Sequence, residues 1–350
     1  MSETITTVIP TFQRPKLLAR AIKSILAQTY RDCSVLVLDN ASADETASVV
    51  AQMAAQDPRV RYHRQPTNLG ALANFSYGMS SVRTPFFSLL SDDDVLFPEF
   101  YADAIESLQR YPQALMFAGS TLEYDEEGRL GYVPLSFWPR EGLYEPDEAL
   151  RRMLGFKHPT WTGIVFRCSA LELAGPLDPE VGPPADVDFE MRVAARAPMI
   201  VSFKPCAAWV SHPNSVNAGV DAGVVRGYEK MARNIEAVDA LAAGTKKAMV
   251  AGLHRVAVMK LLEIGVKAQV RRDAAAARAA AKTLRERYRQ RVLAASLLAL
   301  SSLCANVAPA QAALRWLESI RLRMRAASAR RRTHASAPEL ERYARYLRMS

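Results

Sequence analysis

The first 90 residues alternate between short apolar runs and longer segments whose apolar residues recur at helical spacing. Strand and helix alternating at this pace build βαβ units, whose right-handed crossovers place helices on both faces of a parallel sheet. We therefore expect an α/β fold with a Rossmann-like, mostly parallel sheet sandwiched by helices. The predicted strands are Ile5–Pro10, Ser34–Asp39, Arg59–His63 and Thr84–Leu90, and the predicted helices are Pro15–Gln28, Ala43–Ala55 and Leu72–Ser81.

The following segment, up to residue 225, is less regular. It predicts a mixed sheet with loops, including a long loop over Tyr132–Pro146, a stretch rich in aromatic residues and proline. Its predicted strands are Ala114–Ala118, Ile164–Arg167, Ile200–Phe203 and Ala207–Val210.

Beyond about Gly227 the strand patterns end and only helical patterns follow. A chain of 350 residues exceeds the usual domain size of about 100–200 residues. We expect a first domain over residues 1–225, with halves of about 1–112 and 113–225, and an all-α domain over residues 226–350. The predicted helices are Met231–Ala243, Lys247–Gln269, Asp273–Gln290, Val292–Asn306 and Ala310–Arg325.

Charge divides the chain at the same place. The net charge is −8 through Val225 and +17 from Arg226 onward. Such asymmetry indicates either a basic region with its own partner, such as anionic lipid or nucleic acid, or a solvated alanine-rich helical surface. The most apolar run, Val292–Ala308, is shorter than the roughly 20 residues of a bilayer span. It is either a core helix or a helix lying in a membrane interface.

The composition fits a folded protein of a reducing compartment. The chain is 49% hydrophobic and 23% charged, which excludes the disordered and fibrous classes. Its four cysteines contain no C-x-x-C pair, so neither a disulfide framework nor a structural zinc site is expected. The N-terminal residues do not have the pattern of a secretory signal, and a cytoplasmic location is the expectation.

Polar clusters follow four successive predicted strands. In an open α/β sheet, ligands bind outside the carboxyl ends of the strands, so these clusters predict one site. The strongest of them is Asp92-Asp93-Asp94. Three adjacent carboxylates repel one another, and a hard divalent cation removes that cost. The alternative is a helix N-terminus, where acidic residues are also favoured. The other clusters are Pro10–Arg14, Asp39–Ser42 and Asn68–Gly70.

Taken together, these residues resemble the family 2 glycosyltransferases, which have the GT-A fold. The matching pieces are VIPTFQRPKLLARAIKSILAQTY, VLVLDNASADET, NLGALANFSYGM and LLSDDDVLFPEF, and the resemblance covers roughly residues 4–215. In motif the chain is closest to the bacterial rhamnosyl- and abequosyl-type transferases.

The resemblance implies a nucleotide-sugar site and a metal. Pro10, Thr11 and Phe12 would hold the base, Asp39 would accept a hydrogen bond from it, and Asp93 would bind Mn²⁺ or Mg²⁺. Ser91 stands where many relatives have the first Asp of a D-x-D element. His212 either approaches the metal or is an isolated surface histidine. The implied nucleotide-sugar set is Pro10, Thr11, Phe12, Arg14, Asp39, Asn40, Asn68, Gly70, Asn74, Ser91 and Asp92, with Asp94 as a supporting group.

On the acceptor side, the resemblance implies that Trp161, Thr162 and Gly163 lie beneath the acceptor sugar. It also implies that Asp186 is the general base, because Asp186 matches the Asp of a family motif in which Ala185 here replaces a frequent Glu. A carboxylate on a loop at a helix start is suitably placed to reach an acceptor hydroxyl. The alternative is that Asp186 caps the helix, although Asp188 could serve there instead.

The function implied is metal-dependent, inverting transfer of a sugar from a nucleoside-diphosphate donor to a hydroxyl of a saccharide or lipid-linked saccharide, in bacterial surface polysaccharide synthesis. The basic helices would then dock on the inner face of the cytoplasmic membrane. The alternative is a non-catalytic nucleotide-sugar-binding protein whose basic tail binds nucleic acid or membrane. Nucleic acid is disfavoured because few aromatic residues are interleaved with the basic ones. A nucleotidyltransferase is disfavoured because Pro10–Pro15 contains no glycine.

Overall fold

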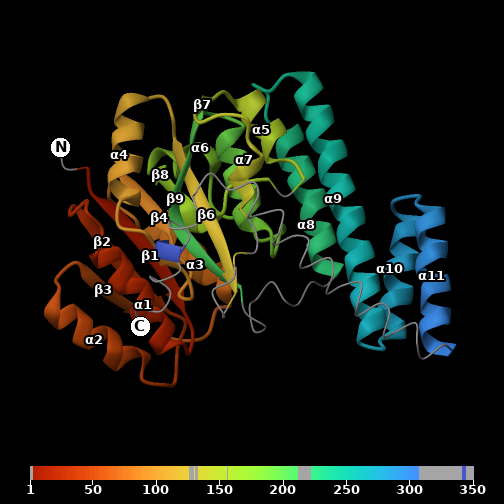
Figure 1. Cartoon of the computed structure of the whole chain (residues 1–350), viewed down its shortest axis with the longest axis horizontal. Coiled ribbons are helices and arrows are strands. Elements are labelled where there is room, and N and C mark those ends of the chain that lie inside the picture. Colours follow the sequence, from red (N-terminus) through yellow and green to blue (C-terminus); the bar gives the residue numbers. More distant parts are fainter. Residues whose placement is uncertain are drawn as a thin grey trace.

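The computed structural model describes residues 3–125, 130, 133–155, 157–211, 222–306 and 341–343. In this part of the chain a central sheet is covered by helices on both faces, and four further helices follow it (Figure 1). The predicted α/β sandwich with a helical C-terminal region is confirmed.

The sheet elements and their covering helices follow the chain in alternation. They are β1 (Ile5–Thr11), α1 (Pro15–Leu26), β2 (Cys33–Asp39), α2 (Thr46–Gln56), β3 (Val60–Arg64), α3 (Ala71–Ser81), β4 (Phe86–Leu89), β5 (Val95–Leu96), α4 (Phe100–Arg110), β6 (Met116–Asp125), the 3-10 helix η1 (Pro134–Phe137), β7 (Gly142–Tyr144), α5 (Pro146–Met153), the 3-10 helix η2 (Trp161–Gly163), β8 (Ile164–Arg167), α6 (Ser169–Ala174), α7 (Ala185–Ala194) and β9 (Met199–Ser211). The helical region contains α8 (Ala222–Glu236), α9 (Ala243–Val270), α10 (Ala274–Glu286) and α11 (Arg291–Asn306).

Strand order brings the polar strand ends together. The order is β3-β2-β1-β4-β8-β6-β9-β5, and β7 also pairs with β9. Strands β1 to β4 are parallel, whereas β8 is antiparallel to both β4 and β6. Thr11 lies opposite Asp39 at the end of the β1–β2 ladder. The residues that follow β1, β2 and β4 therefore meet at one edge of the sheet.

The core forms on both faces of the parallel strands because side chains alternate along each strand. Ile5 and Ile9 pack with α1 on one face, whereas Val8 and Leu38 pack with α3 on the other. Gly78 of α3 lies so close to the sheet that a Cβ would come within 2.4 Å of both Leu38 and Val8 side-chain atoms. A side chain at this position would push α3 off the sheet.

Two predictions for the second half are corrected. Ile200–Phe203 and Ala207–Val210 are parts of one strand, β9, which continues through Pro205. Pro205 lies opposite Ser120 at register shifts in the β6–β9 ladder, where the missing N–H of proline is tolerated. The predicted long loop over residues 132–146 contains η1 and β7 within its described part.

The helical region differs from the prediction mainly in its first helix. Helix α8 begins at Ala222, earlier than expected, so residue 225 lies inside this helix. The domain boundary between residues 225 and 226 stays a prediction. The helix predicted over 310–325 lies outside the described residues. Among the described helices, none is both long enough and apolar enough to cross a membrane. Helix α9 packs closely against its neighbours at Gly252 and Gly265, where an added Cβ would clash with Leu154 and Leu297.

Candidate functional site

The ends of β1 and β4 are held together by predicted donor-site and metal-site residues and by Arg20, which the sequence analysis did not single out. Thr11 Oγ1 donates to Asp92 Oδ2 at 2.7 Å, and Arg14 Nη1 donates to Asp93 Oδ2 at 2.9 Å and to Asp92 Oδ1 at 3.3 Å. Arg20 Nη2 donates to the backbone oxygen of Asp93 at 2.6 Å. Burial and the charge of Asp93 raise the pKa of Asp92 to about 6, although Thr11 and Arg14 oppose the shift.

Asp94 faces the interior and joins the two halves of the sheet. Its carboxylate accepts hydrogen bonds from Thr162 Oγ1 and from the backbone N–H of Val210, the latter at 3.1 Å. Burial, together with the charges of Asp93 and Asp92, raises the pKa of Asp94 well above its ordinary value. Asp94 therefore links the loop after β4 to η2 and β9, and Asp93 is the most exposed carboxylate of the three.

The loop after β2 is joined to the loop after β3. Asn40 Nδ2 donates to Asn68 Oδ1 at 2.8 Å, and Asn40 Oδ1 accepts from the backbone of Leu69. The buried Asp39 accepts from Tyr62 Oη at 2.5 Å and from the backbone of Ser42 at 2.8 Å. The predicted residues Asp39, Asn40, Asn68 and Gly70 therefore lie in one connected cluster.

Backbone conformations in the left-handed region mark the loops after β1 and β2. Gln13 has φ 56° and Ala41 has φ 64°, and the backbone N–H of Gln13 donates to Ser42 Oγ, which ties the loops together. Non-glycine residues in this region are uncommon and concentrate at functional sites. Phe12 between these loops is 41% exposed, so an aromatic face is available beside the polar cluster.

Asn74 occupies a different place from the one predicted. It is 1% exposed, its Nδ2 donates to the carbonyl of Leu38, and its Oδ1 accepts from Gln65. Because the first turn of α3 packs against the sheet here, the side chain of Asn74 faces the interior and not the polar cluster at the strand ends. Gly70, with φ 82°, allows the chain to turn into α3.

The predicted acceptor residues lie mostly inside the fold. Trp161 packs edge-on between Phe75 and Phe189, and its buried indole N–H has no hydrogen-bond partner in the part of the chain that the structure describes. Thr162 is 2% exposed, and its hydroxyl donates a hydrogen bond to Asp94. At Gly163, an added Cβ would lie 2.3 Å from Thr121 Oγ1, so close packing explains this glycine. The prediction of direct acceptor contact at Thr162 and Gly163 is thus corrected to a packing role.

Asp186 lies in the first turn of α7, half-buried, and its Oδ1 accepts from the backbone N–H of Val187 at 2.8 Å. It is not the N-cap, since the helix is preceded by Pro184 and has no side-chain cap. Burial raises the pKa of Asp186, whereas the neighbouring His158 lowers it. A carboxylate of this kind can accept a proton.

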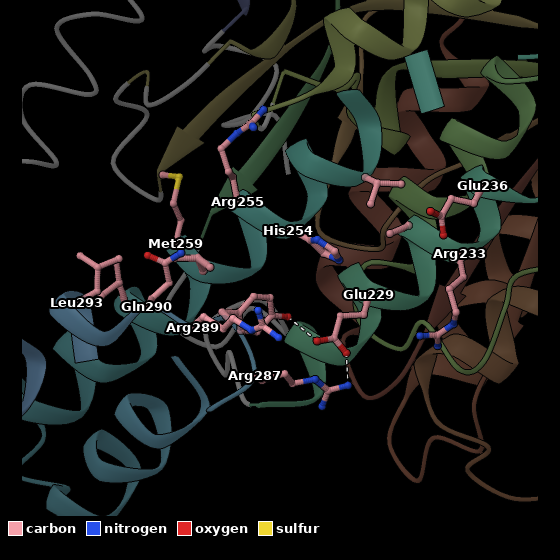
Figure 2. Close-up of a pocket in the computed structure, with 15 residues that line it drawn as sticks. Glu229, Arg233, Glu236, His254, Arg255, Met259, Arg287, Arg289, Gln290 and Leu293 are labelled. Carbon is pink, nitrogen blue, oxygen red and sulfur yellow. Dashed lines mark hydrogen bonds and ion pairs between the residues drawn. The ribbon is translucent and has the colours of Figure 1, made fainter. Parts of the chain in front are cut away.

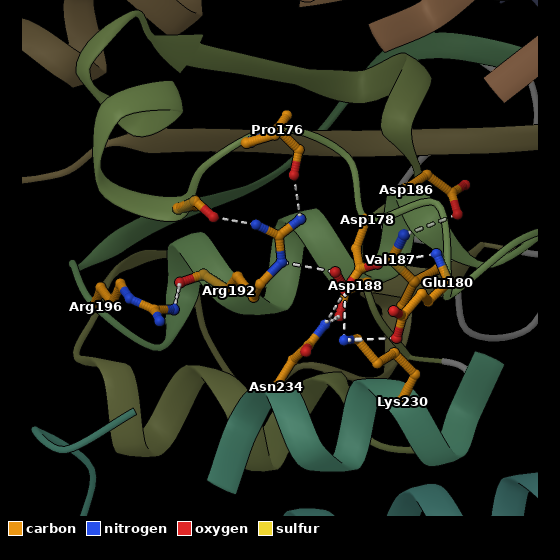
Figure 3. Close-up of polar contacts among 11 residues, drawn as sticks. Pro176, Asp178, Glu180, Asp186, Val187, Asp188, Arg192, Arg196, Lys230 and Asn234 are labelled. Carbon is orange, nitrogen blue, oxygen red and sulfur yellow. Dashed lines mark hydrogen bonds and ion pairs between the residues drawn. The ribbon is translucent and has the colours of Figure 1, made fainter. Parts of the chain in front are cut away.

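A charged network holds α7 in place (Figure 3). Arg192 Nε donates to Asp188 Oδ2 at 2.6 Å, and its other nitrogens donate to the carbonyls of Ala174 and Pro176. Asn234 of α8 donates to Asp188 Oδ1 at 2.9 Å. The alternative of Asp188 as a helix cap is therefore wrong: Asp188 instead connects α7 to the loop before it and to α8.

We expect Asp188→Ala to lower the free energy of unfolding by about 3 kcal/mol, because it leaves the guanidinium of Arg192 buried without its carboxylate. Urea unfolding followed by circular dichroism measures this change. Asp239→Ala is the control, since Asp239 is exposed. Equal stability of the two variants would contradict the role given to the network.

Two residues beside Asp186 were missed by sequence reasoning. Glu190 lies one turn after Asp186 on α7, is 1% exposed, and neither of its oxygens has a hydrogen-bond partner among the described residues. His158 Nδ1 is 3.7 Å from Glu190 Oε2. Burial raises the pKa of Glu190 to about 7 against the opposing effect of His158. The i, i+4 spacing of Asp186 and Glu190 was visible in the sequence, but the approach of His158 was not.

The described residues contain no group of three or more His, Cys, Asp or Glu side chains placed to hold a metal ion. His212, the second predicted metal ligand, lies outside the described residues.

Comparisons with known proteins agree on the family. Residues 6–173 match the family model described as Glycosyl transferase family 2. A Campylobacter jejuni GalNAc(5)-diNAcBac-PP-undecaprenol beta-1,3-glucosyltransferase is 37% identical over 26% of this chain and 30% of its own. The succinoglycan biosynthesis protein ExoW of Rhizobium meliloti is 32% identical over 33% of this chain and 38% of its own. The chain thus spans less than half the length of these curated relatives.

Solved structures show the same fold. TarS 1-349 of S. aureus in complex with UDP-GlcNAc has a TM-score of 0.61 at 14% identity, covering 82% of this chain and 92% of that one. The mannosyltransferase PcManGT of Pyrobaculum calidifontis, in complex with GDP-Man and Mn²⁺, has a TM-score of 0.53 at 17% identity, covering 93% and 86%. This likeness confirms the GT-A architecture. Residues 6–173, just under half of the chain, thus form a domain of glycosyltransferase family 2.

Proposed function

We propose that the protein is a metal-dependent, inverting glycosyltransferase that moves a sugar from a nucleoside diphosphate to a hydroxyl of a saccharide or lipid-linked saccharide. The observation that carries this proposal is the cluster at the sheet edge, where Thr11, Arg14, Asp92 and Asp93 are in contact. The exposed Phe12 beside it offers a surface for a base, and Asp39 and Asn40 line the same edge.

The position of Asp93 fits a divalent cation. Asp92 and Asp93 share the guanidinium of Arg14, Arg20 contacts the backbone oxygen of Asp93, and the side chain of Asp93 is more exposed than that of Asp92. One carboxylate completed by phosphate oxygens is an arrangement that suits Mg²⁺ or Mn²⁺. Asp93, the most exposed carboxylate of the Asp92–Asp94 cluster, would hold the ion, which when bound would neutralise charge on the leaving diphosphate. The Mn²⁺ in the PcManGT complex supports this assignment.

Asp186 would remove the proton from the acceptor hydroxyl. The hydroxyl oxygen forms a bond to the anomeric carbon while the bond from that carbon to the diphosphate breaks, and the electron pair of the broken bond leaves with the diphosphate. Attack from the face opposite the diphosphate inverts the configuration. The raised pKa of Asp186, caused by burial, makes this carboxylate a stronger base than an exposed one.

A lipid-linked acceptor would bring the enzyme to the inner face of the cytoplasmic membrane, in the synthesis of bacterial surface polysaccharide. The names of the relatives support this part of the proposal, since one specifies PP-undecaprenol and another succinoglycan biosynthesis. The high positive charge of the helical region agrees with it.

The test is a thermal-shift panel with UDP, dTDP, GDP and CDP, each in Mn²⁺, Mg²⁺ or EDTA. A ligand that binds only the folded state raises the melting temperature by mass action. We expect one nucleotide to stabilise the protein and only with metal. Stabilisation by nucleotide without any sugar transfer to an acceptor would favour the non-catalytic binding protein, and no shift under any condition would remove the nucleotide-sugar proposal.

His158 provides a pH-dependent prediction. Its positive charge lowers the pKa of Asp186, and its own pKa is raised because the charges of Glu190 and Asp186 outweigh the effect of burial. In His158→Gln the pKa of Asp186 rises, so more of this base is protonated in mildly acidic solution. We expect the acidic limb of the kcat profile to move to higher pH, with rates near wild type in alkaline buffer. An equal loss of kcat at every pH would contradict this expectation.

A further inference from the structure

A cleft of about 780 Å³ lies in the helical region (Figure 2). Its walls come from α8, α9, the connection between α10 and α11, and the first turn of α11. Its apolar part is formed by Ala232, Val250, Val258, Met259, Leu262 and Leu293. The cleft is thus separate from the cluster at the sheet edge and belongs wholly to the helical region.

Arginines surround this apolar lining. Arg233 of α8, Arg255 of α9 and Arg289 of the α10–α11 connection line the cleft and are exposed. No carboxylate partner of these three occurs in the described part of the chain. A fourth, Arg287, donates to Glu229, which also accepts from Tyr288 Oη at 2.6 Å. Glu229 is therefore neutralised. Glu236 also lines the cleft, so four arginines face two carboxylates there and the described lining keeps a net positive charge.

The helical region around the cleft is rich in basic residues, and one of its helices, α11, has a long stretch without charged side chains. Residues 222–306 contain sixteen Lys and Arg against six Asp and Glu. Residues 292–306 of α11 contain no charged side chain, and Val292 and Leu303 there are 77% and 50% exposed. Met259 at the cleft is 58% exposed. Exposed apolar side chains beside arginines suit an amphiphilic anion, because such a ligand has both a charged group and an apolar part. A purely polar ligand would gain nothing from the apolar side chains.

We propose that this cleft binds the phosphate headgroup of an anionic membrane lipid and docks the enzyme on the bilayer surface. The three arginines take the phosphate, and the apolar wall and the exposed face of α11 contact the acyl region. This inference rests on the membrane part of the proposed function and specifies the surface involved. It does not depend on catalysis.

The test is sedimentation of the full-length protein with vesicles, without donor or metal. Vesicles are made either of phosphatidylcholine alone or of phosphatidylcholine with phosphatidylglycerol in equal parts. We expect binding only to the anionic vesicles. The triple variant Arg233→Gln, Arg255→Gln, Arg289→Gln should bind about 100-fold more weakly, since each arginine near the surface contributes about 1 kcal/mol.

The matched control carries Lys247→Gln, Arg278→Gln and Lys282→Gln. These three residues are exposed, belong to the same helical region and do not line the cleft, so this variant loses the same charge elsewhere. Its binding should stay well above that of the cleft variant. If the two variants lost vesicle binding equally, the attraction would come from the whole basic region, and the proposal that the cleft binds lipid would be refuted. Absence of vesicle binding by the wild-type protein would also refute it.

A second comparison separates docking from catalysis. Val292→Ser with Leu303→Ser should weaken binding even at high salt, because it removes apolar contacts that salt does not screen. Asp186→Asn should bind vesicles as wild type does. Vesicle binding without transferase activity would leave the cleft standing and refute the proposed function, whereas the reverse result would refute only the cleft.

Discussion

Asp186→Asn lowers kcat about 10³-fold, which is the range expected for loss of a positioned general base. The amide keeps the size and the hydrogen bond to the backbone of Val187, but it cannot accept the acceptor proton at neutral pH. Because Asp186 lies on α7, away from the residues joined at the ends of β1 and β4, donor affinity should not change. The measurements are kcat for sugar transfer and the Kd of the nucleotide found by thermal shift.

Asp239→Asn, an exposed residue after α8, is the control and should have the activity of wild type. If Asp186→Asn weakened donor binding as much as it slowed turnover, Asp186 would belong to the donor site and another group would be the base.

Asp93→Ala abolishes the metal-dependent part of nucleotide binding. The substitution removes the most exposed carboxylate of the Asp92–Asp94 cluster and leaves Arg14 paired with Asp92. Wild type at a nucleotide concentration 100 times its Kd should be stabilised by about 2.7 kcal/mol, and this gain should disappear in the variant. Melting temperatures with nucleotide in Mn²⁺ and in EDTA provide the comparison.

Folding of the Asp93 variant can be checked through its melting temperature without nucleotide, and Asp239→Ala again serves as the control. Unchanged stabilisation by nucleotide with the same metal dependence would mean that Asp93 is not the metal ligand.

Local sequence patterns predicted the parallel half of the sheet well, because each strand and helix there is encoded by its own periodicity. They could not predict that β8 enters between β4 and β6, since pairing over that distance leaves no local signal. They also divided β9 at Pro205, because proline normally interrupts a strand, and only the bulge opposite Ser120 explains its tolerance.

The same distinction holds for the site. Thr11, Arg14, Asp92 and Asp93 were predicted from their positions at strand ends, and the structure brings them into contact. Asn74 was predicted with them from another motif of the family resemblance, but the packing of α3 turns it inward. His158 could not be predicted beside Glu190, because the turn that carries it is positioned by tertiary contacts and not by a motif.

The insertion of β8 has a consequence for how the chain is made. Strand β4 ends at Leu89, whereas its neighbour β8 begins only at Ile164. During synthesis at about 5–20 residues per second, β4 is an open edge for several seconds, and Phe87 lacks the ring of Phe166 on β8 against which it stacks. A fragment ending near residue 112 would keep that edge permanently and would be prone to aggregate. The nucleotide half therefore depends on the later half to become a stable unit.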